Sequence, residues 1–136
     1  MGSFAILEHT ADIGVRAEGA TLEELFAQAT RGLAAIIGIW QPGGGKSRRI
    51  DVSADDLGAL LVDWLSEALY VHDTQLMAFT DVVVHTVRDG RAVGTLHVTP
   101  LTLSETEGTQ VKAITYHDLS VERVGGRWVA IVYFDI

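Results

Sequence analysis

The sequence contains no cysteine, which excludes disulfide bonds, thiolate metal sites and a cysteine nucleophile. That absence fits a reducing compartment, and no basic segment followed by an apolar one resembles a signal peptide, so we expect a cytoplasmic protein. Long apolar runs are also missing. The longest, residues 33–37 and 129–134, are too short to span a bilayer, so no membrane association is expected.

Positive charge is scarce as well. Ten lysines and arginines face 18 acids, which gives a net charge of −8. The only basic cluster is Lys46, Arg48 and Arg49, which is more typical of a solvated strand than of an RNA footprint. Because phosphate contacts need clustered lysine and arginine, the composition argues against strong direct binding of nucleic acid. If RNA belongs to the pathway of this protein, a partner must hold it.

The 136 residues, 48% of them apolar, are enough for one domain over 1–136 with its own core. Thr21 and Glu24 form a capping box before a helical apolar pattern, which predicts a helix over 22–37. Ser53 and Asp56 give a second capping signal before an apolar stripe that begins at Leu57. With strands elsewhere, we expect an α+β fold: a largely antiparallel sheet with two helices packed on one face.

The predicted strands include 4–7, 13–17 and two hairpins. The first hairpin, 82–98, turns at Asp89-Gly90, and the second, 111–135, turns at Gly125-Gly126. A two-residue turn in the second hairpin sets Tyr116 opposite Asp135 and His117 opposite Phe134. Alternation then predicts that His117 faces the core, whereas Lys112 shares the other face with Asp135.

The segment between the first two predicted strands, residues 8–14, carries Glu8, His9, Thr10 and Asp12. One interpretation is a tight turn in which Thr10 or Asp12 bonds nearby backbone amides. The other is that Asp12 is a ligand for a hard cation or an acid–base group, with His9 close to the site. Isolated acids are more often structural, so these residues by themselves favour the turn.

Hard oxygen donors also occur at the far end of the sequence. Asp135 and the carboxylate of Ile136 suit Ca²⁺, Mg²⁺ or Mn²⁺, and Asp12 could supply another ligand. Lys112 stands out because the sequence has only one other lysine. It is either an ordinary strand lysine paired with an acid or a cation placed beside an acidic metal pocket.

A third candidate feature is the stripe formed by Asp63, Glu67 and Tyr70 on the second predicted helix, at positions i, i+4 and i+7. Two like charges four residues apart slightly destabilise a helix. The stripe is typical of a solvated face, and the alternative is an acidic patch for a basic partner.

Four segments together resemble the archease family. They are residues 7–14 (LEHTADIG), residues 60–70 with Asp63, Trp64 and Glu67, residues 108–117 (GTQVKAITYH) and the final Phe134-Asp135-Ile136. They occur in the family's order and extend over nearly the whole sequence. One departure is residues 99–107, which lack the Gly-Glu and Arg-His pairs of many archeases and leave the role of this loop open.

The resemblance implies a small α+β fold of strand-helix-strand-strand units. Archeases are protein cofactors of the RtcB-type RNA ligase, which joins tRNA halves with GTP and manganese, and they promote its guanylylation and repeated turnover without being ligases. By resemblance, Asp12, Asp135 and the Ile136 carboxylate correspond to the metal site, and Lys112 corresponds to a functionally required lysine.

The expected function is therefore non-enzymatic activation of a tRNA ligase, with Glu8, His9 and Lys112 contributing beside the metal. Two alternatives stay open at this point. One is a metal-dependent hydrolase of a small phosphate ester that uses Asp12 and His9, although no nucleophile–base pair is evident. The other is a general chaperone-like interaction module in which the metal only holds the chain terminus.

Overall fold

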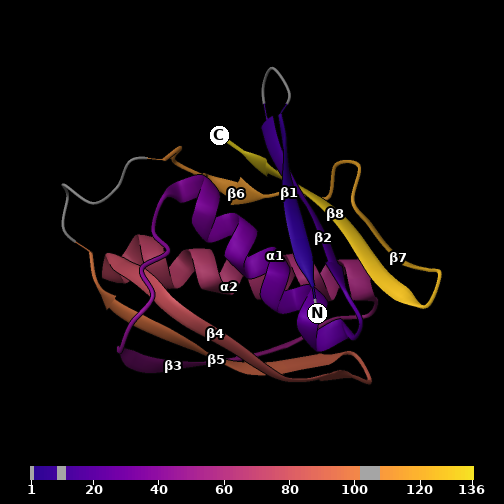
Figure 1. Cartoon of the computed structure of the whole chain (residues 1–136), viewed down its shortest axis with the longest axis horizontal. Coiled ribbons are helices and arrows are strands. Elements are labelled where there is room, and N and C mark those ends of the chain that lie inside the picture. The colour runs from indigo at the N-terminus through magenta and orange to yellow at the C-terminus, as the bar shows by residue number, and fades with distance from the viewer. Residues whose placement is uncertain (1, 9–11, 102–107) are drawn as a thin grey trace.

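A computed structural model describes residues 2–8, 12–101 and 108–136 and confirms the α+β class (Figure 1). Among these residues, no helix combines the length and apolar composition needed to cross a membrane. In chain order the elements are β1 (Ser3–Glu8), β2 (Asp12–Gly19), α1 (Leu22–Ile37), β3 (Lys46–Ser53), α2 (Leu57–Gln75), β4 (Met77–Arg88), β5 (Arg91–Pro100), β6 (Ala113–Ile114), β7 (Ser120–Val124) and β8 (Arg127–Asp135).

Both helices begin at side-chain caps. The predicted bounds of α1 are confirmed: the Glu24 amide donates to Thr21 Oγ1 at 3.1 Å, and Gly38 ends the helix in the left-handed region at φ 82°. In α2 the cap is Asp56, whose Oδ1 accepts a hydrogen bond from the Ala59 amide at 2.8 Å. Ser53, the other half of the predicted signal, is the last residue of β3.

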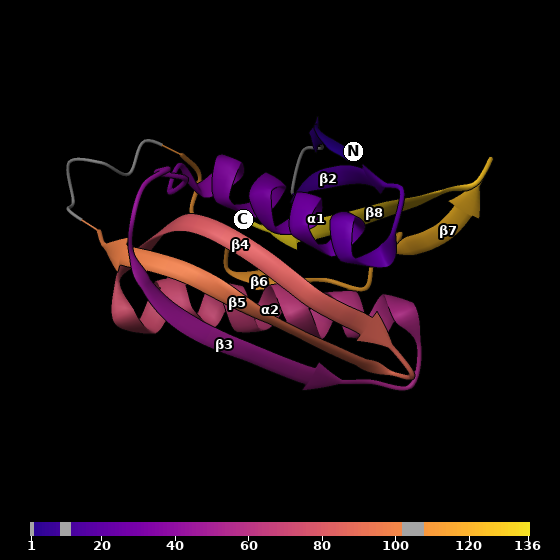
Figure 2. The same ribbon diagram turned by 60° about the horizontal axis from the view of Figure 1, so that its bottom comes forward.

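The strands divide between two sheets rather than forming the one we expected. The order β1-β2-β8-β6, with β7 also paired to β8, makes the larger sheet, and β3-β5-β4 makes the smaller one. Each helix contacts strands of both sheets, so the helices lie between them (Figure 2). Gly32, Leu33 and Ala34 of α1 are all buried. Three consecutive helical residues span more than half the circumference, so a single sheet could not cover them.

The first predicted hairpin is confirmed. Arg88 of β4 lies opposite Arg91 of β5, and the turn residues Asp89 and Gly90 have φ values of 53° and 75°. Positive φ at both central residues is the type I′ geometry that matches the twist of paired strands.

The second predicted hairpin holds only near its turn. Val124 lies opposite Arg127 as expected, and the register continues to Ser120 opposite Ile131. Beyond that point the chain leaves the sheet through a turn in which Asp118 has φ 52°. When pairing resumes, Ala113 rather than Tyr116 lies opposite Asp135, a slip of three residues.

The slip makes the predicted position of His117 wrong. His117 lies in the turn rather than on the core face, with 71% of its side chain exposed and Nε2 at 3.2 Å from Asp118 Oδ2. Tyr116 is likewise exposed. Side-chain alternation holds only while a strand stays regular, and an inserted turn resets it.

A charged cluster on the smaller sheet gives a pH-dependent prediction. Arg91 of β5 donates to both Asp51 carboxylate oxygens, at 2.8 and 2.5 Å, and these bonds, with a weaker one from Arg49, lower the pKa of Asp51 to about 2. A depressed carboxyl pKa adds stability above the unfolded value of 3.8, and this is lost as pH falls towards 2. We expect Asp51→Asn to lower the melting temperature at pH 7 and to have a much smaller effect at pH 2, where about half of the folded-state Asp51 carboxyl groups are protonated. An equal loss of melting temperature at pH 7 and at pH 2 would contradict the stabilising role of the ionised Asp51.

Candidate functional site

Two aspartates from distant parts of the sequence, Asp12 and Asp135, meet at one end of the larger sheet. β2 and β8 are antiparallel neighbours, and their register sets Asp12 directly opposite Asp135. Directly opposed residues in such a pair have Cα atoms about 4.5–5.5 Å apart. Asp12 is thus a close neighbour of the residue that precedes Ile136, and Figure 1 shows the C-terminus at this end of the sheet.

Both aspartates lie on the outer face of that sheet. Their neighbours Ile13 and Phe134, also opposite each other, turn towards the core, where Phe134 is fully buried. Alternation therefore sends Asp12 and Asp135 to the other face, where Asp12 is half-buried and Asp135 is exposed. Like charges directly opposite each other destabilise a strand pair unless something neutralises them. The carboxylate of Ile136 adds a third negative charge one residue further on.

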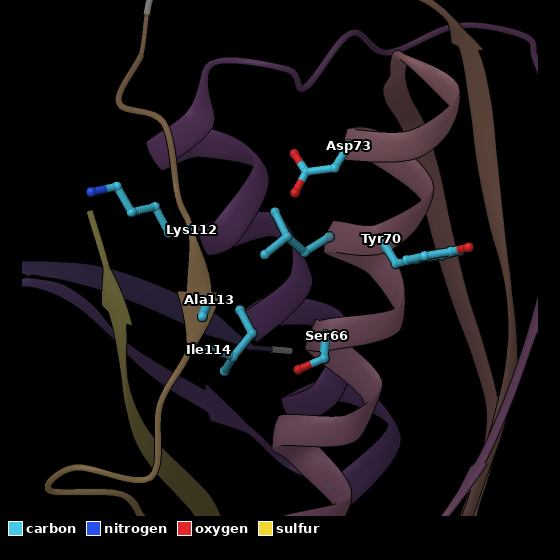
Figure 3. Close-up of a pocket in the computed structure, with 7 residues that line it drawn as sticks. Ser66, Tyr70, Asp73, Lys112, Ala113 and Ile114 are labelled. Atoms are coloured by element: carbon cyan, nitrogen blue, oxygen red, sulfur yellow. The ribbon is translucent and has the colours of Figure 1, made fainter.

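Lys112 lies beside this acidic end of the sheet. Its backbone amide donates to the Asp135 carbonyl oxygen at 2.8 Å, immediately before β6 begins. The side chain leads away from α2 towards the end of β8 (Figure 3). The predicted face is wrong, because Ala113, not Lys112, is the residue that shares a face with Asp135. The three-residue slip nevertheless sets Lys112 beside Ile136, whereas the predicted register would have carried it past the end of β8.

Gly14 of the opening segment has a packing role next to the aspartates. It lies opposite Tyr133, and a Cβ atom at Gly14 would come within 2.7 Å of the Tyr133 ring. Tyr133, only 8% exposed, therefore covers the glycine with its ring on the same face as Asp12 and Asp135. A bare backbone at this position lets the aromatic side chain lie flat against β2.

We expect Gly14→Ala to lower the free energy of unfolding by about 1–3 kcal/mol, because the added methyl group must displace the Tyr133 ring. Urea denaturation measures this loss. Gly14→Ala combined with Tyr133→Leu should recover part of it, since the smaller side chain leaves room for the methyl group. A double variant no more stable than Gly14→Ala would show that the ring contact is not the cause.

The remaining predicted site residues are placed as follows. Glu8 ends β1 opposite Ile13, so its backbone adjoins the acidic end of the sheet. His9 lies outside the described residues, as does most of the divergent loop 99–107. Within the described ranges, no group of three or more His, Asp and Glu side chains is arranged to hold a metal. Among the described residues, a metal at Asp12 and Asp135 would therefore need a donor of another kind, such as the chain carboxylate.

The stripe predicted on α2 is largely exposed. Asp63 is half-buried, Glu67 is exposed, and Tyr70 is 59% exposed. The acids keep the solvated positions that suit charged side chains, and both interpretations of the stripe require this exposure. Tyr70 also lines a cavity shared with Lys112.

Comparison with known proteins identifies the family. The family model described as the Archease protein family (MTH1598/TM1083) matches residues 4–136. The chain belongs to the archease family. It is 38% identical to the archease of Thermococcus kodakarensis over 132 residues, covering 90% of this chain and 91% of the relative. It is 35% identical to the archease of Methanosarcina mazei, covering 98% and 95%.

Solved archease-family structures share the fold. The solution structure of protein 1598 of Methanobacterium thermoautotrophicum aligns with a TM-score of 0.86 at 28% identity, covering 98% of both chains. The Thermotoga maritima protein described as an archease and possible chaperone aligns with a TM-score of 0.67 at 24% identity, covering 96% of this chain and 94% of that one. At this lower identity the likeness concerns the fold alone.

Two residues that the sequence did not single out share a cavity with Lys112. Ser66 and Asp73 of α2 line the cavity that Lys112 also lines. With Tyr70 they follow the helical spacing i, i+4 and i+7, so their backbone positions lie along one side of α2. That spacing was visible in the sequence, but nothing there indicated that β6 would lie across this side.

Proposed function

We propose that this protein is a non-catalytic activator of an RtcB-type RNA ligase, promoting guanylylation and repeated turnover of the ligase in tRNA splicing or RNA repair. The observation that carries the proposal is the register that sets Asp12 opposite Asp135, next to Ile136 and Lys112. Family membership supports it, because archeases are known as activators of this ligase.

The acidic end of the sheet is suited to a divalent cation. Asp12, Asp135 and the Ile136 carboxylate would hold it, and carboxylate oxygens are the donors that Ca²⁺, Mg²⁺ and Mn²⁺ prefer. The fit follows from charge, since carboxylates opposed across a strand pair repel one another without a cation. A bound cation would supply positive charge that neutralises nucleotide phosphates during transfer of a nucleotidyl group.

The described residues assign separate tasks around that cation. The two aspartates, fixed by the pairing of β2 with β8, would present it at a defined place on the sheet edge. The Lys112 ammonium group, next to the same edge, would add a second positive charge facing a nucleotide. Rigid placement of charge is most of what phosphoryl-type transfer requires of a protein.

The net charge of −8 fits a protein that acts on an RNA enzyme without gripping RNA. Phosphate contacts would require clustered cations, which a ligase that binds tRNA halves must provide itself. An acidic activator is then attracted to the basic surface of its partner rather than to the substrate.

Purified ligase from the same organism tests the proposal. With labelled GTP and Mn²⁺, a substoichiometric amount of this protein should raise the rate of ligase guanylylation and convert single-turnover joining into multiple turnover. The protein by itself should release no phosphate from GTP or from p-nitrophenyl phosphate.

Three other results would contradict the proposal. An unchanged ligase rate with turnover of a phosphate ester by this protein alone would indicate the hydrolase. Equal protection of unrelated unfolded proteins, unaffected by substitution of Asp12 or Lys112, would indicate a chaperone-like module. No effect in any of these assays would also reject the activator.

A further inference from the structure

A cavity of about 260 Å³ lies between α2 and the segment that leads into β6. Its lining combines side chains from the two elements: Ser66, Leu69, Tyr70, Asp73, Lys112, Ala113 and Ile114. The volume is enough for one large side chain of another protein, and too small for a nucleotide. Because Lys112 belongs both to this cavity and to the acidic end of the sheet, the two sites adjoin.

The polar groups of the cavity come mainly from α2. Figure 3 shows the Asp73 carboxylate and the Ser66 hydroxyl pointing from the helix towards β6, while Tyr70 points away and Lys112 leads towards the end of β8. The apolar lining consists of Leu69 and Ile114, which are 5% and 9% exposed. The cavity therefore has an apolar floor, a hydroxyl group and one negative charge at its rim, that of Asp73, whose side chain is 48% exposed.

The negative charge of Asp73 lacks a full partner among its described neighbours. The nearest group is Nε2 of His72, 3.9 Å from Asp73 Oδ1. The other ring nitrogen, Nδ1, lies 2.9 Å from the Met77 carbonyl oxygen, which can only accept, so Nδ1 carries the proton. In the neutral ring Nε2 then has no hydrogen to donate to Asp73.

We infer that this cavity receives an arginine side chain of the ligase. The guanidinium group would pair with the Asp73 carboxylate, and the aliphatic stem would lie on Leu69 and Ile114. Arginine suits the site better than lysine, since its planar, weakly hydrated head bonds a carboxylate through two donors. The inference rests on the proposed function, which supplies the basic partner.

Charge complementarity on the same helix supports this occupant. Glu67 is exposed and Asp63 half-exposed on the helix that carries Asp73, and the whole chain has a net charge of −8. A ligase that binds RNA presents lysine and arginine on its surface. An arginine anchored beside Lys112 would hold the acidic end of the sheet in a defined orientation against the partner.

Asp73→Asn tests the anchor without threatening the fold. Asp73 lies in the last turn of α2, where a negative charge opposes the helix dipole, so its removal should not destabilise the protein. We expect the dissociation constant for the ligase to rise at least tenfold. Ser66→Leu, which fills the cavity without changing charge, should weaken binding in the same direction. The guanylylation rate at saturating protein should stay at the wild-type value for both variants.

The matched control is Asp89→Asn in the turn between β4 and β5. It removes the same charge, and asparagine readily adopts the φ of 53° found there. We expect it to bind the ligase as the wild-type protein does. Equal dissociation constants for Asp73→Asn and Asp89→Asn would overturn the arginine anchor and leave the proposed function intact. No binding by the wild-type protein would instead overturn the proposed function.

A second measurement does not depend on the ligase. In methyl NMR spectra, Nα-acetyl-arginine amide should shift the Leu69 and Ile114 resonances in a saturable way, at millimolar concentrations. The citrulline analogue, which has the same shape without the charge, should not, and Asp73→Asn should abolish the effect. Identical responses to both compounds would overturn the assignment of a guanidinium group.

Discussion

The Asp12→Asn variant should stimulate guanylylation of the ligase roughly 100-fold less than the wild-type protein, because the substitution removes one of two opposed carboxylates and the cation they would hold. Asp135→Asn should have the same effect, since the register places it on the same pair of strands. Quenched-flow measurement of the ligase–GMP intermediate gives the rate. Binding of the ligase should stay within a few-fold of wild type, because charge placement and docking use different residues.

Lys112→Gln distinguishes a chemical role from a structural one. The glutamine keeps the backbone amide that donates to Asp135, so the end of the sheet should stay paired while the ammonium charge is lost. Stimulation should fall, and the melting temperature should not. Asp89→Asn again serves as the control of equal charge change elsewhere. Stimulation at the wild-type level in both Asp12→Asn and Lys112→Gln would contradict the proposed use of this site.

The second large effect concerns stability. At a concentration about 100 times its dissociation constant, a divalent cation that binds only the folded state adds about 2.7 kcal/mol, which corresponds to roughly 10 °C in melting temperature for a domain of this size. Only the folded chain brings Asp12 and Asp135 together, so a cation held by both aspartates would bind only the folded state. Thermal scans in EDTA, Ca²⁺, Mg²⁺ and Mn²⁺ would measure the gain and rank the ions.

The effect of Asp12→Asn on the melting temperature should have opposite signs without and with a divalent cation. In EDTA, Asp12→Asn should melt at or above the wild-type temperature, since it relieves the repulsion between opposed carboxylates. In excess cation it should melt lower than the wild-type protein. One glycine added after Ile136 should also reduce the gain, because it moves the chain carboxylate away. An equal gain in all three proteins would show that the cation binds elsewhere.

Local sequence signals predicted the elements whose ends depend on nearby residues. The capping box at Thr21 and the apolar period gave the bounds of α1. Asp89-Gly90 and Gly125-Gly126 gave two turns and the pairing next to each of them. These features depend on contacts within a few residues, so the sequence pattern carries nearly all the information they need.

The register beyond Ser120 could not be predicted in the same way. The turn around Asp118 shifts the pairing by three residues. The sequence has no glycine or proline between Thr115 and Leu119 that would predict this turn. The shift is favoured by distant packing: Ile114 pairs with Phe134 and joins the core beneath α2, while His117 moves out to solvent. Burial of apolar surface decides between registers, and burial is a property of the assembled layers.

The sequence by itself determined the composition of the candidate site: three carboxylates near the two ends of the sequence and one uncommon lysine, in a chain with a net charge of −8. Only the tertiary structure decided that Asp12 lies opposite Asp135, that Lys112 lies beside Ile136, and that Asp73 and Ser66 face β6. The reason is physical. Residue types and short-range periods are written along the chain, whereas neighbours more than 100 residues apart are chosen by which packing of sheets and helices buries the most apolar surface.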